Sequence, residues 1–305
     1  MKARIAFWAG VSRAPFFTAA ALPVGLGAAA AWWHSGQFHG GLFALTAIGA
    51  VLLHAGANIT NDYYDHLTGA DELNVNYFTP LYGGSRMIQQ GLMTPRATII
   101  AGMTCLGAGA AIGIALTVLR GWPILALGAA GSIMAFFYTA PPVKLSYRGW
   151  GEPAVALSFG ALMVAGAEYV QVRHITAVGL AASVPVSLLI LQVLFVNQFP
   201  DAPSDGQAGK RNWVVRLGTR RARYGVSLIY AATYASILAA IAFGLAPGWC
   251  LIALLTAPLA AGASMVNLQY HDQPKRLPPA SGLTIATHAL TTLLLAIGYL
   301  LGAAR

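Results

Sequence analysis

Asparagine and aspartate residues gather in two short groups that lie far apart in the chain. The first group is Asn58, Asn61, Asp62, Asp65 and Asp71, and the second is Asn197, Asp201 and Asp205. In both groups an Asn precedes an Asp by four positions, and the second such pair follows the first at an offset of 139 residues. Because residues three or four apart share one face of an α-helix, each group can present its carboxylates and amides together.

Clustered carboxylates repel one another unless a cation compensates them. Mg²⁺ prefers oxygen ligands, keeps several waters and typically joins one or two carboxylates to substrate phosphates. Asp and Asn are also common at polar turns, and that plainer interpretation is adequate for one group alone. Two groups with matching spacing favour a shared site for Mg²⁺ and a phosphate-bearing ligand.

Cationic residues follow these groups in the chain. Lys144 and Arg148 lie in the polar segment 138–149, and Lys210 and Arg211 come directly after the second acidic group. Lys as a point charge and Arg as a planar fork can neutralise the negative charge that a magnesium-bound diphosphate retains. Retention of cations on the cytoplasmic side of a membrane is the alternative reason for their presence.

The elements that must position these residues are apolar segments long enough to cross a bilayer, which takes about 20 residues. Nine segments qualify, at residues 14–33, 41–61, 97–119, 121–140, 153–172, 175–200, 224–245, 248–269 and 282–302. The sequence therefore predicts an all-α, polytopic membrane protein. The two acidic groups fall at the ends of the second and sixth segments, on the same side of the membrane. Pro200 and Pro203 predict that the sixth helix is kinked or broken there.

Charge counting predicts the orientation in the membrane. Nine spans place 15 Lys and Arg residues on one side and 3 on the other. Short cytoplasmic loops carry the excess of cations, so we expect the N-terminus in the cytoplasm and the C-terminus outside. The cation-rich side also holds eight of the nine acids, with Glu168 alone opposite. Its loops at 62–96 and 201–223 are the longest, and long ordered loops are often functional.

Composition excludes several other classes of protein. The chain is 57% hydrophobic and 9% charged, and its mean hydropathy of +0.64 is too high for a soluble globular protein. A net charge of +9 does not indicate nucleic-acid binding, because most of the chain lacks a water-facing surface. Cys105 and Cys250 lie in apolar segments and support neither a disulfide framework nor a cysteine-ligated metal. We expect one transmembrane domain over residues 1–305, with a weak internal repeat whose halves are about 1–140 and 141–305.

Four motifs resemble those of the UbiA superfamily of intramembrane aromatic prenyltransferases. They contain Asn58, Asn61, Asp62, Asp65, Gly69 and Asp71; Gly83, Gly84, Ser85 and Arg86; Tyr138, Lys144, Tyr147, Arg148, Gly149, Gly151 and Glu152; and Asn197, Asp201, Asp205, Ala208, Gly209, Lys210 and Arg211. The spacing of Asp62 and Asp65 is similar to that of the branch that prenylates 1,4-dihydroxy-2-naphthoate for menaquinone synthesis. Pro200 and Pro203 depart from the usual second motif.

The resemblance implies nine helices around a central cavity that opens sideways to lipid and is capped by cytoplasmic loops. It implies Mg²⁺-dependent transfer of a polyprenyl group from a prenyl diphosphate to an aromatic acceptor. The metal ligands would be Asp62, Asp65, Asp201 and Asp205, with Lys144 and Arg148 as further catalytic residues. Substrate would be bound by Asn58, Asn61, Asn197, Lys210, Arg86, Tyr138 and Tyr147. Tyr63, Tyr64 and Tyr138 are candidates for an aromatic wall that stabilises an allylic cation, or for interfacial tyrosines.

Alternatives remain at this point. The acceptor can be a 4-hydroxybenzoate or homogentisate type of ring, and nine spans with an internal repeat also suit a secondary transporter. A transporter usually binds its substrate near mid-membrane. There the predicted spans of this chain contain only two ionisable residues, His54 and His288. A haem or quinol redox subunit requires several facing histidines, and a phosphatidyl-group transferase would carry its acids in one compact motif. Apart from substrates and the lipid bilayer, we expect no nucleic acid and no obligatory protein partner.

Overall fold

The computed structural model describes residues 2–78 and 82–303, and these residues are almost entirely helical. The helices are α1 (Lys2–Val11), α2 (Thr18–Ser35), α3 (Gly40–Leu67), α4 (Ala70–Leu73), α5 (Pro95–Arg120), α6 (Pro123–Phe136), α7 (Gly151–Val155), α8 (Met163–Val172), α9 (Ala177–Gln207), α10 (Trp213–Leu217), α11 (Thr219–Ala242), α12 (Ala257–Tyr270) and α13 (Pro278–Ala303). Short 3-10 segments precede α2, α7, α12 and α13, and a π-helical segment, Ala156–Leu162, joins α7 to α8.

Eight helical segments within the described residues are long and apolar enough to cross a bilayer, which confirms the all-α, multi-pass membrane fold. The predicted ninth span at 121–140 is shorter than expected, because α6 has only 14 residues. At 1.5 Å per residue it extends roughly 21 Å, less than the hydrocarbon core of about 30 Å. The chain leaves the helix at Phe137 and turns back through Pro141 and Pro142, so that the Leu145 amide donates to the Phe137 carbonyl.

Of the two outcomes expected for the sixth helix at Pro200 and Pro203, a kink or a break, the break does not occur in α9. The helix contains Pro185, Pro200 and Pro203 and still continues to Gln207 as one helix, so the prolines do not break it. Each proline removes only its own N–H from the helical ladder. The surrounding packing of Phe195 and Phe199, both buried in one apolar cluster, holds the helix together over this stretch. The second acidic group consequently lies on one continuous helix, as Asn58, Asn61, Asp62 and Asp65 of the first group do on α3.

Polar residues at helix starts define where the spanning helices begin. The side chain of Thr94 accepts from the Ala97 amide at the start of α5, and Thr176 accepts from the Gly179 amide at the start of α9. Both satisfy backbone donors that the first helical turn leaves without partners.

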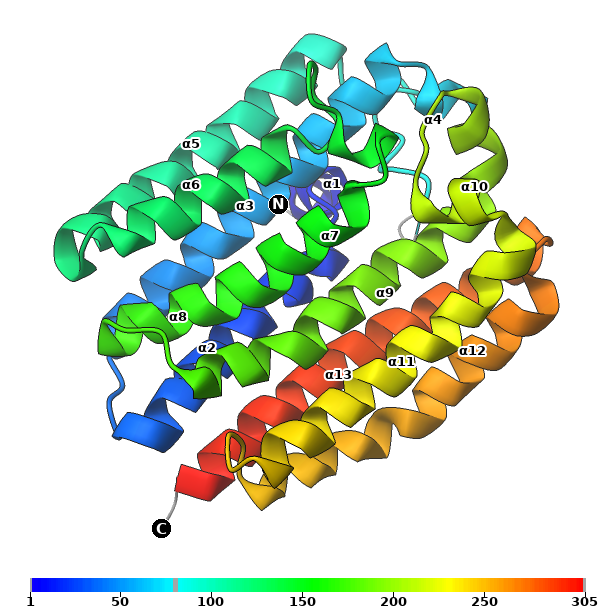
Figure 1. The fold of residues 1–305 in the computed structure, drawn as a ribbon. Helices are drawn as coiled ribbons and strands as arrows, with labels where there is room; N and C mark the ends of the chain where they lie inside the picture. Colours follow the sequence, from blue (N-terminus) through cyan, green and yellow to red (C-terminus); the bar gives the residue numbers. More distant parts are fainter. Residues whose placement is uncertain (1, 79–81, 304–305) are drawn as a thin grey trace.

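Figure 1 shows the helices as one elongated bundle, with α4 and α10 at the same end. Helix α3 packs along α5, α2 lies against α8 and α13, and α9 packs on α11 and α13. We call residues 68–78, 82–94 and 208–218, which include α4 and α10, the cap. Arg173 donates to the Leu119 carbonyl at the opposite end of the bundle, where the cation-poor loops are.

Small residues let the helices approach closely in the interior. A Cβ added at Gly27 of α2 would overlap the Val164 carbonyl of α8, so these helices touch backbone to backbone. Glu168 of α8, expected near an interface, is fully buried. Its carboxylate accepts from Thr176 and lies 3.1 Å from Nε2 of His34, so it joins α2, α8 and the start of α9.

Candidate active site

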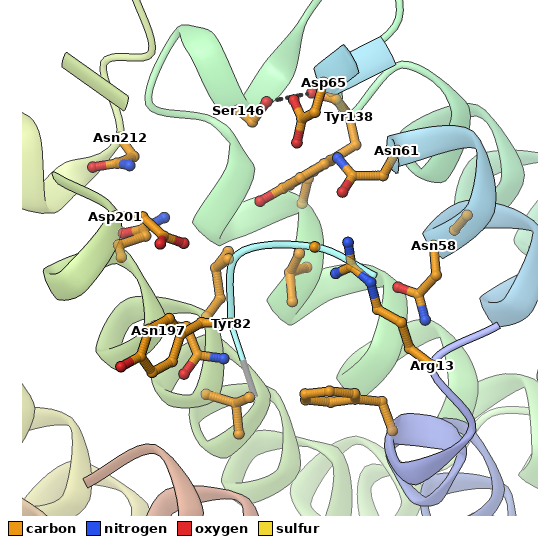
Figure 2. A pocket seen from close by; sticks show the side chains of 18 of the residues that line it. Arg13, Asn58, Asn61, Asp65, Tyr82, Tyr138, Ser146, Asn197, Asp201 and Asn212 are labelled. Carbon is orange, nitrogen blue, oxygen red and sulfur yellow. Dashed lines mark hydrogen bonds between the residues drawn. The ribbon is translucent and has the colours of Figure 1, made fainter. Parts of the chain in front are cut away.

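A cavity of about 250 Å³ lies between α3, α9 and the π-helical segment, below the cap. Figure 2 shows polar side chains converging on it from opposite walls, with Asn58, Asn61 and Asp65 on one side and Asn197 and Asp201 on the other. Deeper in the cavity the lining is apolar and includes Phe16, Phe159, Ile190, Val193 and Leu194. The cavity therefore has a polar end and an apolar interior.

The structure brings eight of the thirteen sequence-predicted site residues to the wall of this cavity. They are Asn58, Asn61, Asp65, Tyr138, Asn197, Asp201, Asp205 and Lys210. The two acidic groups, which are 139 residues apart in the chain, thus face one space from α3 and α9.

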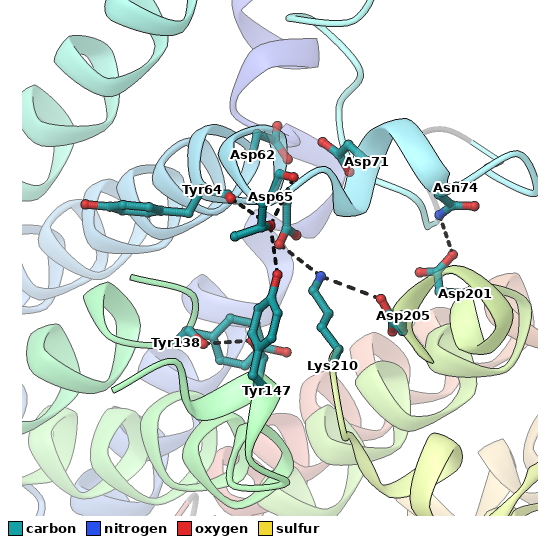
Figure 3. A network of polar contacts seen from close by, with 12 residues as sticks. Asp62, Tyr64, Asp65, Asp71, Asn74, Tyr138, Tyr147, Asp201, Asp205 and Lys210 are labelled. Atoms are coloured by element: carbon teal, nitrogen blue, oxygen red, sulfur yellow. Dashed lines mark hydrogen bonds and ion pairs between the residues drawn. The ribbon is translucent and has the colours of Figure 1, made fainter. Parts of the chain in front are cut away.

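Lys210 stands between the two acidic groups. Its ammonium nitrogen lies 2.9 Å from Oδ1 of Asp65 and 3.6 Å from Oδ1 of Asp205, as Figure 3 shows. Burial alone lowers the pKa of Lys210, but Asp65 and Asp205 outweigh it and raise that pKa well above its ordinary value. Lys210 is therefore a fixed positive charge that holds the ends of α3 and α9 together.

Cap residues hold the second acidic group in place. Asn74 donates to Asp201 at 2.8 Å, and Asn212 donates to Asp205 at 2.7 Å. Asn212 also caps α10, because its side-chain oxygen accepts from the Val215 amide. The carboxylates thus keep oxygens toward the cavity while neutral donors fix their orientation.

Asp62 points away from the cavity wall. Its carboxylate pairs with the Arg13 guanidinium and faces the Ser85 amide. Burial lowers the pKa of Arg13, but Asp62 and Asp71 raise it on balance, so the guanidinium stays charged. Arg13 itself lines the cavity. Its ion pair with Asp62 fixes the segment before α2 against the end of α3.

Four further predicted residues lie around the cavity and do not line it. Arg86 donates to the Asp71 carbonyl and lies over the Tyr77 ring. Tyr147 donates to the Thr68 hydroxyl at 2.8 Å, and Lys144 lies over its ring at 5.0 Å. Arg148 is exposed and donates to the Pro142 carbonyl at 3.0 Å. Lys144, Tyr147 and Arg148 order the loop between α6 and α7, whereas Arg86 orders the segment between α4 and α5.

The three tyrosines proposed as an aromatic wall separate in the structure. Tyr138 lines the cavity and is held by the Ser146 hydroxyl, which donates to its carbonyl. Burial and the nearby Glu152 raise the pKa of Tyr138, so its phenol stays neutral. Tyr63 and Tyr64 pack edge to face on each other and are absent from the described cavity lining.

Glu152, from the third motif, joins two parts of the site. It is fully buried, and its Oε1 accepts from the Trp213 amide at 2.6 Å. The Trp213 indole donates to the Gly149 carbonyl at 3.0 Å. Together these bonds fix α10, and with it the segment that carries Lys210, against the start of α7.

Sequence reasoning missed several residues of the cavity wall. Arg13, Asn74, Tyr82 and Asn212 line it and were not predicted; Asp71 also lines it, and it had been named in the first acidic group without a role in the site. Asp71 was visible as the last acid of the first group, whereas nothing in the local sequence marks Arg13 or Asn212. Burial, Asp65 and Asp62 raise the pKa of Asp71 to about 8, and burial together with Asp201 raises the pKa of Tyr82 to about 12.

The donor set fits Mg²⁺ when it arrives with a phosphate ligand. Among residues 2–78 and 82–303, no three His, Cys, Asp or Glu side chains are close enough to form a metal cage by themselves. Mg²⁺ usually requires only one or two carboxylates, with waters and substrate phosphates completing its shell. Oxygens of Asp65, Asp201 and Asp205 face one cavity, which supplies such carboxylates from two sides.

The fold and cavity together define a class: a multi-pass membrane protein whose buried site has carboxylates and a cation at one end and apolar walls at the other. Comparison with known proteins gives the family. A family model described as the UbiA prenyltransferase family matches residues 20–280. The chain belongs to the UbiA prenyltransferase family and is a prenyltransferase.

Two curated relatives are similar over most of the chain. A 1,4-dihydroxy-2-naphthoate octaprenyltransferase of Mycobacterium tuberculosis is 36% identical over 265 residues, covering 86% of each chain. A 2-carboxy-1,4-naphthoquinone phytyltransferase of Synechocystis is 27% identical over 294 residues, covering 96% of this chain and 92% of the relative.

The solved structure of a UbiA homologue from Archaeoglobus fulgidus has the same fold. It superposes with a TM-score of 0.67 at 14% identity, over 98% of this chain and 99% of that one. A structure of that homologue bound to GPP and Mg²⁺ has a TM-score of 0.57 at 15% identity, over 94% and 99% of the two chains.

Proposed function

We propose that the protein transfers a polyprenyl group from a prenyl diphosphate to 1,4-dihydroxy-2-naphthoate, a step of menaquinone biosynthesis. One observation carries the proposal: Asp65, Asp201, Asp205 and Lys210 from α3, α9 and the cap meet at the polar end of a cavity with an apolar interior. A prenyl diphosphate has the matching shape, with a charged head and an apolar tail.

The head of the donor would lie at the polar end. Asp65, Asp201 and Asp205 would hold Mg²⁺ on the diphosphate, with amide oxygens of Asn58, Asn61 and Asn197 assisting from the same walls. Asp62, which the sequence predicted as a fourth metal ligand, forms an ion pair with Arg13. We propose that Asp62 positions the end of α3. The Archaeoglobus fulgidus homologue, which has the same fold, binds GPP and Mg²⁺, and this supports a prenyl diphosphate with Mg²⁺ as the ligand.

Bond cleavage would begin at the carbon–oxygen bond of the donor. The electron pair leaves with the diphosphate oxygen, so negative charge grows where Lys210 and Arg13 supply positive charge. Bound Mg²⁺ supplies further Lewis-acid stabilisation of that leaving group. The allylic carbon becomes positive, and the ring face of Tyr138 can stabilise it. The apolar walls limit access of water, which would otherwise capture the cation.

The acceptor ring would then attack the allylic carbon, forming the new carbon–carbon bond as the ring carboxylate leaves. The Mycobacterium tuberculosis relative, at 36% identity, is a 1,4-dihydroxy-2-naphthoate octaprenyltransferase, which supports this acceptor over other aromatic rings. We further propose that the cap faces the cytoplasm and that the C-terminal end of α13 faces the outside, because the cations concentrate at the cap end.

Product analysis tests this function. The purified protein is incubated in lipid vesicles with Mg²⁺, an all-trans polyprenyl diphosphate and one acceptor at a time, and products are identified by mass. We expect a prenylated, decarboxylated naphthalene product from 1,4-dihydroxy-2-naphthoate and none when EDTA removes the metal. Prenylation of 4-hydroxybenzoate or homogentisate in its place would overturn the acceptor assignment.

A further inference from the structure

A second cavity continues from the first one into the membrane-spanning part of the bundle. It has a volume of about 150 Å³ and lies between α2, α3, α5, α6, the π-helical segment and α8. Its lining contains no Asp, Glu, Lys or Arg among the described residues. His54, Ala135, Ser158 and Phe159 line both cavities, so these four side chains form the boundary between them.

Two of these four boundary side chains, His54 and Phe159, form an aromatic pair. The rings of His54 and Phe159 meet edge to face with centroids 4.6 Å apart. His54 is 6% exposed, and its Nδ1 has no hydrogen-bond partner within residues 2–78 and 82–303. Phe159 comes from the π-helical segment, a local widening of a helix that often occurs at functional sites. Close contact of Gly160 with the Ser187 backbone of α9 holds that segment in place.

The depth of the second cavity suits a long apolar chain. Along α3 its lining runs from His54 to Thr46, eight residues or roughly 12 Å. Asp65, at the polar end of the first cavity, is eleven residues or roughly 16 Å further along the same helix. Together the two cavities follow α3 for about the thickness of the hydrocarbon core.

Glycines keep the second cavity open. Gly128 and Gly131 of α6 both line it. A Cβ added at Gly128 would meet nothing within 4 Å, and one at Gly131 would meet only Leu162, at 3.9 Å. Side chains at these positions would therefore occupy free volume and would not displace a neighbouring helix.

We propose that the second cavity receives the distal isoprenoid units of the donor and that the His54–Phe159 pair determines how long a chain the enzyme accepts. This inference rests on the proposed function, because the donor's head must lie at the Asp65 end. The continuity of the two cavities and the uncharged lining identify the occupant as the remainder of the same apolar tail. The distal isoprenoid units of a long donor are buried in the second cavity. A short donor ends before it reaches the His54–Phe159 pair.

The test compares donors of different length in the same vesicles. We measure kcat/KM for geranyl diphosphate and for an all-trans polyprenyl diphosphate of octaprenyl length with the wild type, Gly128→Leu and Gly131→Leu. We expect each leucine to lower the long-to-short ratio of kcat/KM at least tenfold, about the effect of withdrawing two methylene groups from apolar contact. Gly107→Leu is the matched control: it is a helical glycine of α5 outside this lining, with open space at its Cβ, and its ratio should equal that of the wild type.

A second variant, which enlarges the opening between the two cavities where the leucines fill the second one, provides a test if a leucine variant fails to fold. Phe159→Ala opens the boundary and should raise the long-to-short ratio. An unchanged ratio in the folded leucine variants and in Phe159→Ala would overturn the inference while leaving prenyl transfer intact. Absence of transfer from any donor by the wild type would instead refute the proposed function.

Discussion

The ammonium nitrogen of Lys210 lies 2.9 Å from a carboxylate oxygen of Asp65, although 144 positions separate the two residues in the chain. The contact joins the cap segment after α9 to the last turns of α3. Because Lys210 also lies 3.6 Å from Asp205, a single cation links both acidic groups.

Removing this cation should damage the leaving-group site. We expect Lys210→Met to lower kcat/KM by about 10²–10³, the usual effect of losing one group that stabilises developing negative charge. Lys210→Arg keeps the charge and should retain part of the activity, since the planar guanidinium cannot reproduce the compact ammonium. Radiolabelled prenyl transfer in membranes measures both variants. Lys275→Met, an exposed position near the start of α13, should behave as wild type, and equal losses in both methionine variants would contradict the assignment.

The pair of Arg13 and Asp62 should stabilise the fold, in addition to the positive charge that Arg13 presents to the cavity. Removing either partner leaves the other buried without compensation, which costs about 3–5 kcal/mol. Arg13→Met and Asp62→Asn should each lower the apparent Tm in detergent, and the double variant should be less destabilised than the two losses added together. Strict additivity in this cycle would show that the two side chains do not stabilise each other.

Binding of Mg²⁺ with a diphosphate analogue should strengthen as the pH rises toward 8. Burial, Asp65 and Asp62 raise the pKa of Asp71 to about 8, so below that pH the folded protein holds a proton on this carboxyl. A bound cation favours the ionised form, and binding must then release the proton at a cost of up to about tenfold in affinity per pH unit. The affinity for Mg²⁺ with the diphosphate analogue is measured as a function of pH for the wild type and Asp71→Asn. Between about pH 6 and 8 the logarithm of this affinity should rise less steeply with pH in Asp71→Asn than in the wild type. Identical slopes would exclude Asp71 as the titrating group.

Gly179 should be intolerant of any side chain. A Cβ there would overlap the buried Glu168 carboxylate, which also accepts from Thr176 at the start of α9. We expect Gly179→Ala to destabilise the protein by about 2–3 kcal/mol through overpacking, measured as a lower apparent Tm. Gly282→Ala on α13, where a Cβ meets nothing within 4 Å, is the control and should leave Tm unchanged or raise it slightly, because alanine favours a helix over glycine; equal Tm values for both variants would be inconsistent with this packing.

Much of the architecture follows from the sequence because a bilayer imposes strict rules on it. Apolar length located eight of the spans to within seven residues at each end, since backbone groups in lipid must be satisfied within a helix. The same criterion predicted a full span at 121–140, where α6 is too short to be one. There hydropathy continues through Phe136 and Phe137, but the chain has already begun the turn that leads to Pro141 and Pro142. Hydropathy measures apolar content and does not locate a turn.

The candidate site was only partly predictable. Helical spacing explains why Asn58, Asn61 and Asp65 share the cavity wall, and the repeat of that spacing identified Asn197, Asp201 and Asp205. Periodicity could not determine that Asp62 turns toward Arg13, because that contact depends on the segment before α2 returning to the end of α3. Similarly, Arg148 belongs to a matching motif and yet bonds the Pro142 carbonyl at the surface.

The central claim is that the ends of α3 and α9 hold one magnesium-bound diphosphate together. Equilibrium binding of a non-reactive prenyl thiodiphosphate, with and without Mg²⁺, tests it most directly in Asp65→Asn, Asp201→Asn and the double variant. Asp272→Asn, at an exposed position outside the cavity lining, serves as the control. We predict that each site variant loses most of the magnesium-dependent affinity, about 100-fold or more, and that the double variant loses less than the sum of the two free-energy changes. Wild-type, magnesium-dependent affinity in either single variant would contradict the claim.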